Sequence, residues 1–245
     1  MAGKHHKERK PLSEVVSAKL PPKPDPDTGL PFPPEGPVYV GPKLREGEVR
    51  GPMEGAPPRK AMPLEGMGRP LAWVVRGRKD GIKGLIFTLC VAAVVIALPS
   101  LFRGDGLEAW TVWQMWAVAF VGAWLMADPL NRETISAGAD WVQWYKRPKW
   151  YQWRKREPHL VKTYRLTNIE GYAAGAVLYL RVVDEDGRGS DRIRSGLQPD
   201  RRIWDLVYNG ILHSVAAGAE INSLAIDMLR LEGSPALQIQ SDQRD

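Results

Sequence analysis

The sequence predicts a membrane protein with a two-helix transmembrane hairpin (mainly α), a disordered Pro-rich N-terminal arm and a small α+β C-terminal cytoplasmic domain. Three observations predict this class. Residues 84–102 and 109–127 form two uncharged runs of 19 residues, each about the length of a membrane span. Fifteen of the 21 prolines fall in residues 1–70, and residues 159–232 mix strand-like and helix-like patterns.

The first 70 residues predict a disordered Pro/Gly-rich arm, because their composition cannot bury enough surface to offset the entropy of folding. Pro21 and Pro24 have the PxxP spacing of ligands for aromatic-grooved modules, with Lys23 between them. Prolines this dense also produce that spacing by accident, so a spacer is the favoured interpretation. A basic juxtamembrane segment follows at residues 71–83.

The two spans are predicted to be antiparallel, because only the short external loop 103–108 joins them. Lys and Arg are concentrated before the first span and after the second, which predicts a two-pass protein of the cell (inner) membrane with both termini cytoplasmic. Neither span contains an ionisable residue, so ion-coupled transport by this chain alone is not expected.

Small residues recur at every fourth position in each span, and such stripes allow two helix backbones to approach closely. We therefore expect helix–helix packing at Ala93, Ala97, Ala119, Ala123 and Ala127.

Residues 128–158 predict an interfacial amphipathic segment that begins with a helix capped by Asp128. Residues 141–156 carry six basic residues, six aromatics and no acidic residue. This composition suits anionic lipid of the inner leaflet, and also single-stranded nucleic acid; lipid is favoured because a span lies beside it. The expected contact residues are Trp141, Trp144, Tyr145, Lys146, Arg147, Lys149, Trp150, Trp153, Arg154, Lys155 and Arg156.

Residues 159–232 predict a small α+β domain with strands at 160–166 and 176–183, a turn at Asp186-Gly187, and helices after Pro199 and over 220–231. Residues 233–245 are expected to be a disordered tail. So small a core favours a homo-oligomer or a protein partner. From residue 159 onward ten basic residues face twelve acidic ones, which argues against a nucleic-acid reader in this domain.

Asp205, Asn209 and His213 are the nearest approach to a catalytic constellation, because their spacing aligns them along one helix face. We interpret this row as a solvated face opposite the apolar stripe. The sequence has no nucleotide-binding, zinc-protease or hydrolase motif, and its single Cys90 excludes an intramolecular disulfide. No enzymatic activity, metal or cofactor is therefore expected.

The sequence thus predicts a membrane-anchored interaction or scaffold protein that seats its small domain at the inner leaflet. Two alternatives remain open: a holin-like membrane-permeabilising protein, and a membrane-tethered nucleic-acid-handling accessory of a mobile element.

Overall fold

The computed structural model describes residues 19–44, 48–63, 66–75, 82–83, 85–94, 116–117, 119–123, 133–146 and 159–244. The chain divides into two units. The first unit comprises residues 1–74, 135–145 and 158–245, and the second comprises residues 75–134 and 146–157.

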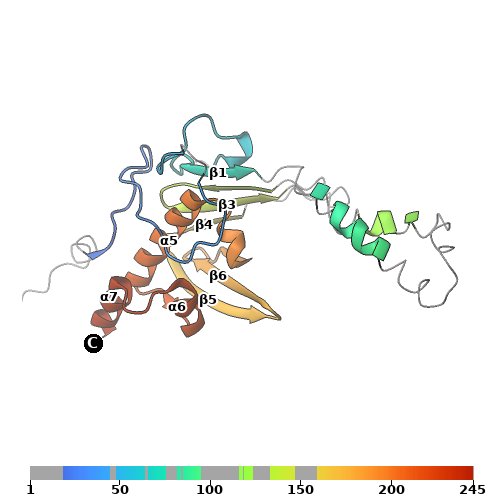
Figure 1. Cartoon of the computed structure of the whole chain (residues 1–245). Helices are drawn as coiled ribbons and strands as arrows, with labels where there is room; N and C mark the ends of the chain where they lie inside the picture. The colour runs from blue at the N-terminus through green and yellow to red at the C-terminus, as the bar shows by residue number, and fades with distance from the viewer. Residues whose placement is uncertain are drawn as a thin grey trace, which may run out of the picture. The chain divides into compact units, whose positions relative to one another are not determined.

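Two four-stranded β-sheets are present (Figure 1). The first has the order β1-β2-β3-β4, and β3 and β4 are antiparallel. Its strands are β1 (Ala72–Val75), β2 (Glu133–Ala137), β3 (Trp141–Lys146) and β4 (His159–Lys162).

The second sheet has the order β7-β6-β5-β8. The β5–β6 and β6–β7 pairs are antiparallel, whereas the short β8 runs parallel to β5. Its strands are β5 (Leu166–Ala174), β6 (Val177–Asp184), β7 (Gly189–Ile193) and β8 (Glu220–Ile221).

The longest helix of the first unit, α5 (Arg201–Ala216), begins at the Asp200 cap, whose side chain accepts from the Arg202 amide. Asn222 caps α6 in the same way through the Ala225 amide. The first unit also has, where it is described, the 3₁₀ turns η1 (Arg59–Ala61) and η2 (Arg194–Leu197) and the helices α6 (Ser223–Leu229) and α7 (Pro235–Arg244).

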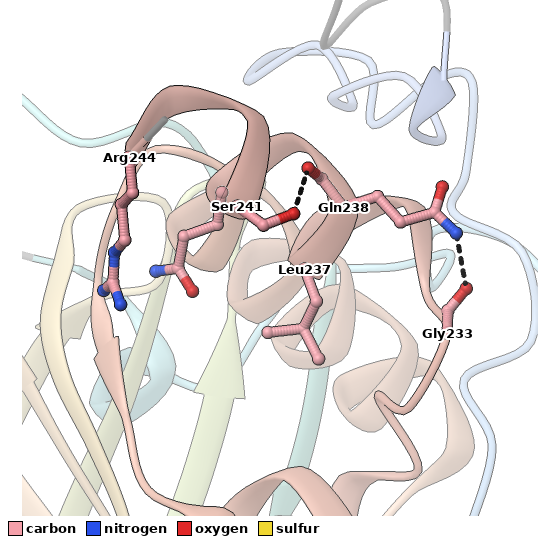
Figure 2. Close-up of a pocket in the computed structure, with 6 residues that line it drawn as sticks. Gly233, Leu237, Gln238, Ser241 and Arg244 are labelled. Atoms are coloured by element: carbon pink, nitrogen blue, oxygen red, sulfur yellow. Dashed lines mark hydrogen bonds between the residues drawn. The ribbon is translucent and has the colours of Figure 1, made fainter.

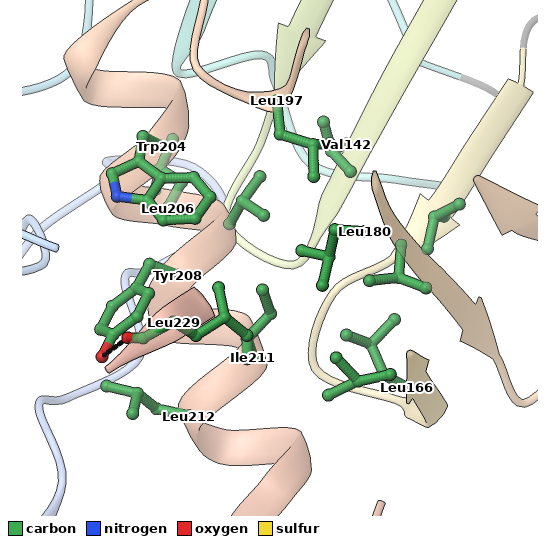
Figure 3. Close-up of a cluster of buried hydrophobic side chains, with 14 of the residues drawn as sticks. Val142, Leu166, Leu180, Leu197, Trp204, Leu206, Tyr208, Ile211, Leu212 and Leu229 are labelled. Atoms are coloured by element: carbon green, nitrogen blue, oxygen red, sulfur yellow. Dashed lines mark hydrogen bonds between the residues drawn. The ribbon is translucent and has the colours of Figure 1, made fainter. Parts of the chain in front are cut away.

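One apolar core joins both sheets to α5, α6 and α7 (Figure 3). Trp144 comes from β3, Leu180 from β6, and Trp204 and Ile211 from α5, each at most 1% exposed. Burying such a side chain contributes about 1.5–3 kcal/mol to stability. The core therefore fixes α5 against both sheets.

Helix α5 is enclosed on every side, since each residue from Arg202 to Ala216 is buried. An amphipathic helix would instead leave its polar residues in water. The expectation of a solvated polar face is therefore wrong. A segment of the N-terminal arm covers that face.

The predicted membrane hairpin fold is wrong, because no helix in the described ranges is long and apolar enough to cross a membrane. The two-pass inner-membrane location, which depended on that hairpin, is overturned with it. The fold is α+β, with two four-stranded sheets.

The described part of the second unit includes helical residues 85–94 and 119–123. Ala93 and Ala119 are half-buried there and Ala123 is buried, whereas Ala97 and Ala127 lie outside the described residues. Packing between the two alanine stripes stays a prediction.

The tryptophan-rich segment forms strands where a helix was expected. Strand β3 carries Trp141 and Trp144, each 1% exposed. Trp144 belongs to the core, while the indole nitrogen of Trp141 donates to the Gly68 carbonyl at 3.2 Å. The strand is therefore covered on both faces. Its sequence consequently lacks the alternation of apolar and polar residues that identifies a half-exposed strand.

The C-terminal region follows the expected order only in part: a turn at residues 163–165 interrupts the strand expected at 160–166, and β7 and β8 were not expected. The helix after Pro199 is present as α5 and ends before Gly218, and the turn at Asp186-Gly187 joins β6 to β7. The helix α7 occupies the region expected to be a disordered tail, and Gln243 Nε2 anchors it by donating to the Ala216 carbonyl at 2.9 Å.

Candidate functional site: a proline-rich strap on helix α5

Residues 20–42, called the strap below, run along α5 without forming helix or strand. Side chains from one face of α5, together with Gln198 just before it, contact the strap backbone. Residues spaced by three and four share a helix face, which explains why these side chains align. This set, called the row below, consists of Gln198, Arg201, Trp204, Asp205, Asn209 and His213.

Two side chains of the row bind consecutive proline carbonyls at the N-terminal end of the strap. His213 Nε2 lies 2.7 Å from the Pro21 carbonyl oxygen. Asn209 Nδ2 donates to the Pro22 carbonyl at 3.1 Å. Proline has no amide proton, so its carbonyl is the only backbone group that a protein can recognise by hydrogen bonding.

Tyr164, in the turn between β4 and β5, completes this end of the site. Its hydroxyl accepts from Asn209 Nδ2 at 2.8 Å, and its ring lies 5.1 Å from the His213 ring. The ammonium of Lys23 sits 4.7 Å above the Tyr164 ring, within cation–π range. An aromatic side chain and a lysine of the strap thus meet beside the two bound prolines.

The C-terminal end of the strap is held by three side chains that donate to three consecutive carbonyls. Arg201 donates to Gly36 at 2.8 Å, the Trp204 indole to Pro37 at 2.9 Å, and Gln198 to Val38 at 3.0 Å. The same Gln198 amide accepts from the Val40 amide at 2.9 Å. The side-chain amide of Gln198 therefore bonds to the strap backbone in the way that the backbone of a neighbouring β-strand would.

Asp205 lies at the centre of the site and has no solvent exposure. Its carboxylate accepts from the Gly36 amide at 2.8 Å and pairs with Arg50 at 3.1 Å and with Arg201 at 3.2 Å. Burial raises the pKa of Asp205, while the Gly36 hydrogen bond and the two guanidinium groups act in the opposite direction. These three partners offset part of the cost of burying the carboxylate.

Burial lowers the pKa of His213, and the positive charge of Lys23 lowers it further, while the bond to the Pro21 carbonyl opposes both. The ring nitrogen Nδ1 is buried without a hydrogen-bond partner in the part of the chain that is described. Both observations favour the neutral imidazole.

Tyr39 packs over the other end of the row, with its ring 4.9 Å from the Arg201 guanidinium. Its hydroxyl donates to the Pro42 carbonyl at 2.7 Å. Burial, together with the charge of Asp200, raises the pKa of Tyr39 to about 12, so the phenol stays protonated at neutral pH. The strap therefore folds back on itself where it leaves α5.

The sequence placed Asp205, Asn209 and His213 on one helix face, and the structure brings them together there. They contact the strap, not solvent. Sequence reasoning missed Gln198, Arg201 and Trp204. The signal available for them was the concentration of hydrogen-bond donors at the start of an otherwise apolar helix.

The residues expected to contact lipid or nucleic acid are not gathered on one described surface. Trp141 and Trp144 are buried, and Tyr145 is half-buried with the Lys60 ammonium 4.9 Å from its ring. Lys146 ends β3. The others lie outside the described residues: Arg147, Lys149, Trp150, Trp153, Arg154, Lys155 and Arg156.

Figure 2 shows a separate hollow of about 370 Å³ along α7. Three of its polar side chains are already bonded within the protein: Gln238 donates to the Gly233 carbonyl, Gln240 to the Ala219 carbonyl and Ser241 to the Gln238 carbonyl. Across the described ranges no group of three His, Cys, Asp or Glu side chains could hold a metal ion. The strap and the row are therefore the best-defined site.

No protein-family model matches the chain, and no curated protein or solved structure is significantly similar to it. The functional argument accordingly rests on the geometry of the strap and the row.

Proposed function

We propose that this chain is an interaction protein whose α5 row binds extended proline-rich segments, with its own strap as the intramolecular ligand. One observation carries the proposal: five side chains of the row bond to five strap carbonyls, three of them prolines. Recognition of proline-rich peptides commonly combines donors for carbonyls with aromatic rings that pack on the chain.

The chemistry of the site favours binding over catalysis. Asp205 is paired with two arginines and an amide, and Asn209 and His213 are occupied by proline carbonyls. A general base needs access to a proton of the substrate. These groups are covered by the strap, so a role in holding a peptide accounts for them better.

Because the strap belongs to the same chain, it can fill the site even if each of its polar contacts is weak. A tethered segment has an effective concentration of about millimolar, so each contact need not be strong for the site to be filled. A proline-rich segment also loses less conformational entropy on binding than a flexible one. The strap therefore has the properties expected of a tethered ligand.

The test is an exchange experiment on the whole chain. A site for a specific protease replaces residues 45–47, so that cleavage separates the strap from the rest of the protein without removing it. A fluorescent peptide of residues 19–44 is then titrated into the cleaved protein. We expect saturable binding, followed by fluorescence anisotropy, as the labelled peptide replaces the cleaved strap.

The matched control is the same cleaved protein with Trp204→Phe, which keeps an aromatic ring but loses the donor to Pro37. We expect the peptide to bind it about tenfold more weakly, as for the loss of one buried hydrogen bond. Equal affinity for the two proteins, or no binding to the first, would contradict the proposal.

A further inference from the structure

We infer that the row is specific for a Gly-Pro-x-Tyr-x-Gly segment, which the strap supplies as residues 36–41. The inference rests on the proposed function and names its ligand class. Each position of the segment meets a different requirement at the row, and these requirements are taken in order below.

Gly36 is recognised by three features at once. Its amide donates to Asp205 at 2.8 Å, so proline cannot replace it, and its carbonyl accepts from Arg201 at 2.8 Å. A Cβ built on Gly36 would lie 3.0 Å from the Trp204 indole nitrogen and 3.1 Å from two ring-proximal carbons of Tyr208. Trp204 and Tyr208 both belong to the packed core, so neither can yield easily.

Pro37 presents its carbonyl to the Trp204 indole at 2.9 Å. A proline at this position holds the preceding residue extended and brings no amide proton that would have to be satisfied. The Gly-Pro pair thus combines the absence of a side chain at one residue with a fixed backbone at the next. Another residue at position 37 would keep the carbonyl but lose this restraint.

The next three positions differ in whether the protein contacts their backbone or their side chain. Gln198 contacts only the backbone of Val38 and Val40, and the Val40 side chain is 59% exposed. Tyr39 between them packs on the Arg201 guanidinium and bonds to the Pro42 carbonyl. We therefore expect positions 38 and 40 to tolerate many side chains and position 39 to require an aromatic one.

Gly41 closes the segment. A Cβ at this position would collide with the backbone oxygen of Gln198 and with the Tyr39 hydroxyl. A Cβ at Gly51, which also precedes a proline, would meet no atom of a non-adjacent residue within 4 Å. Adjacent Gly-Pro residues therefore do not suffice for recognition, and Gly51 provides a matched control.

The first experiment is a competition assay. The protein is cleaved between the strap and the row, and its row is occupied by the labelled peptide of residues 19–44. The unlabelled competitors are a peptide of residues 33–44 and its variants. We expect Gly36→Ala, Gly41→Ala and Tyr39→Ala to weaken competition at least tenfold. Val38→Ala and Val40→Ala should change it less than threefold.

The outcomes separate the two proposals. If the labelled peptide itself fails to bind, the proposed function fails. If it binds but the Gly36→Ala and Gly41→Ala peptides compete as well as the parent, the specificity inferred here is wrong although proline-rich binding stands. If a peptide of residues 19–26 competes fully and the parent 33–44 peptide does not, specificity lies at Pro21 and Pro22 and the inference is overturned.

A second experiment uses the intact chain. Gly36→Ala should accelerate cleavage by trypsin after Lys43 at least tenfold, whereas Gly51→Ala should leave the rate within twofold of the unmodified protein. If Gly36→Ala does not fold, Val40→Pro replaces it, because it removes the amide proton that Val40 donates to Gln198 and restricts the backbone at Tyr39. Equal cleavage of the strap variant and Gly51→Ala would overturn the inference.

Discussion

His213 and Pro21 are 192 positions apart in the sequence, yet His213 Nε2 lies 2.7 Å from the Pro21 carbonyl oxygen. A carbonyl oxygen can only accept, so Nε2 carries the proton and Nδ1 is the bare nitrogen of a neutral ring. Protonating Nδ1 would create a buried N–H for which no acceptor is found among the described residues. Docking of the strap is therefore coupled to the charge of one imidazole.

This coupling predicts a dependence of stability on pH. The pKa of His213 is lowered in the folded protein, so the unfolded chain takes up the proton first, near the ordinary value of about 6.5. The stabilisation is complete above that value and is lost as the pH falls through it. We expect the free energy of unfolding, measured in urea, to fall between about pH 7.5 and about pH 5.5.

The variant His213→Gln isolates this contribution, because glutamine can still donate to the Pro21 carbonyl but does not titrate. Its free energy of unfolding should fall less over the same interval. His159→Gln, at an exposed position at the start of β4, should follow the unmodified protein. Lys23 and Tyr164 also face His213, and burial raises the pKa of the Tyr164 phenol. Parallel pH profiles for His213→Gln and the unmodified chain would contradict the assignment.

The Trp204 indole is predicted to stabilise the fold through its hydrogen bond as well as its volume. Trp204→Phe leaves the Pro37 carbonyl without its donor and a small void at a fully buried position. We expect a loss of about 2–4 kcal/mol in the free energy of unfolding. Tyr208→Phe is the comparison, since it removes only the long 3.4 Å bond to Leu229 and should cost about 1 kcal/mol or less. Similar losses in both variants would refute a special role for the indole donor.

Asp205 and Arg50 are predicted to be energetically coupled. A double-mutant cycle of Asp205→Asn and Arg50→Gln should give a coupling free energy of about 1–3 kcal/mol, because the carboxylate is fully buried and paired. The control cycle, Arg165→Gln with Glu185→Gln, concerns a shorter pair at 2.6 Å that is largely exposed. Its coupling should be below about 1 kcal/mol. A smaller coupling for the Asp205 cycle than for the control would be inconsistent with this account.

Val38 is predicted to tolerate glycine. Its φ of 62° lies in the left-handed region, which costs a β-branched residue about 1–2 kcal/mol. Val38→Gly removes that cost, but the greater freedom of glycine in the unfolded chain lowers stability by about 0.5–1 kcal/mol. Because the gain is at least as large as the loss, thermal unfolding should show a stability equal to or above that of the parent. Val40→Gly, at an exposed position without positive φ, should lose about 0.5–1 kcal/mol. A larger loss for Val38→Gly would mean that its side chain, not its backbone, matters.

The sequence allowed α5 and the alignment of Asp205, Asn209 and His213 along it to be predicted, because both depend on local spacing. The environment of the row was not predictable in the same way. Gly36 bonds to Asp205 across 169 positions, and Val40 bonds to Gln198 across 158. Composition assigned residues 1–70 to a disordered arm because it measures the apolar surface that a segment can bury. Composition contains no information on backbone carbonyl groups that accept hydrogen bonds from side chains far away in the sequence.

The tryptophan-rich strand shows a second limit. Trp141, Trp144 and Tyr145 have a spacing that suits one face of a helix, and their basic neighbours suggested an interface with lipid. In the structure Trp144 enters the core and Trp141 bonds to Gly68 on the other side of β3. A strand covered on both faces carries apolar residues at odd and even positions alike, so periodicity cannot distinguish it from a buried helix.

The position of the strap near the start of the chain has a consequence for synthesis. The ribosome adds roughly 5–20 residues per second, so the 169 positions between Gly36 and Asp205 correspond to a delay on the order of ten to thirty seconds. Until α5 emerges, the proline-rich segment has no cognate surface in its own chain. For that interval the nascent protein presents a Gly-Pro-x-Tyr-x-Gly segment that no α5 of its own chain has yet bound.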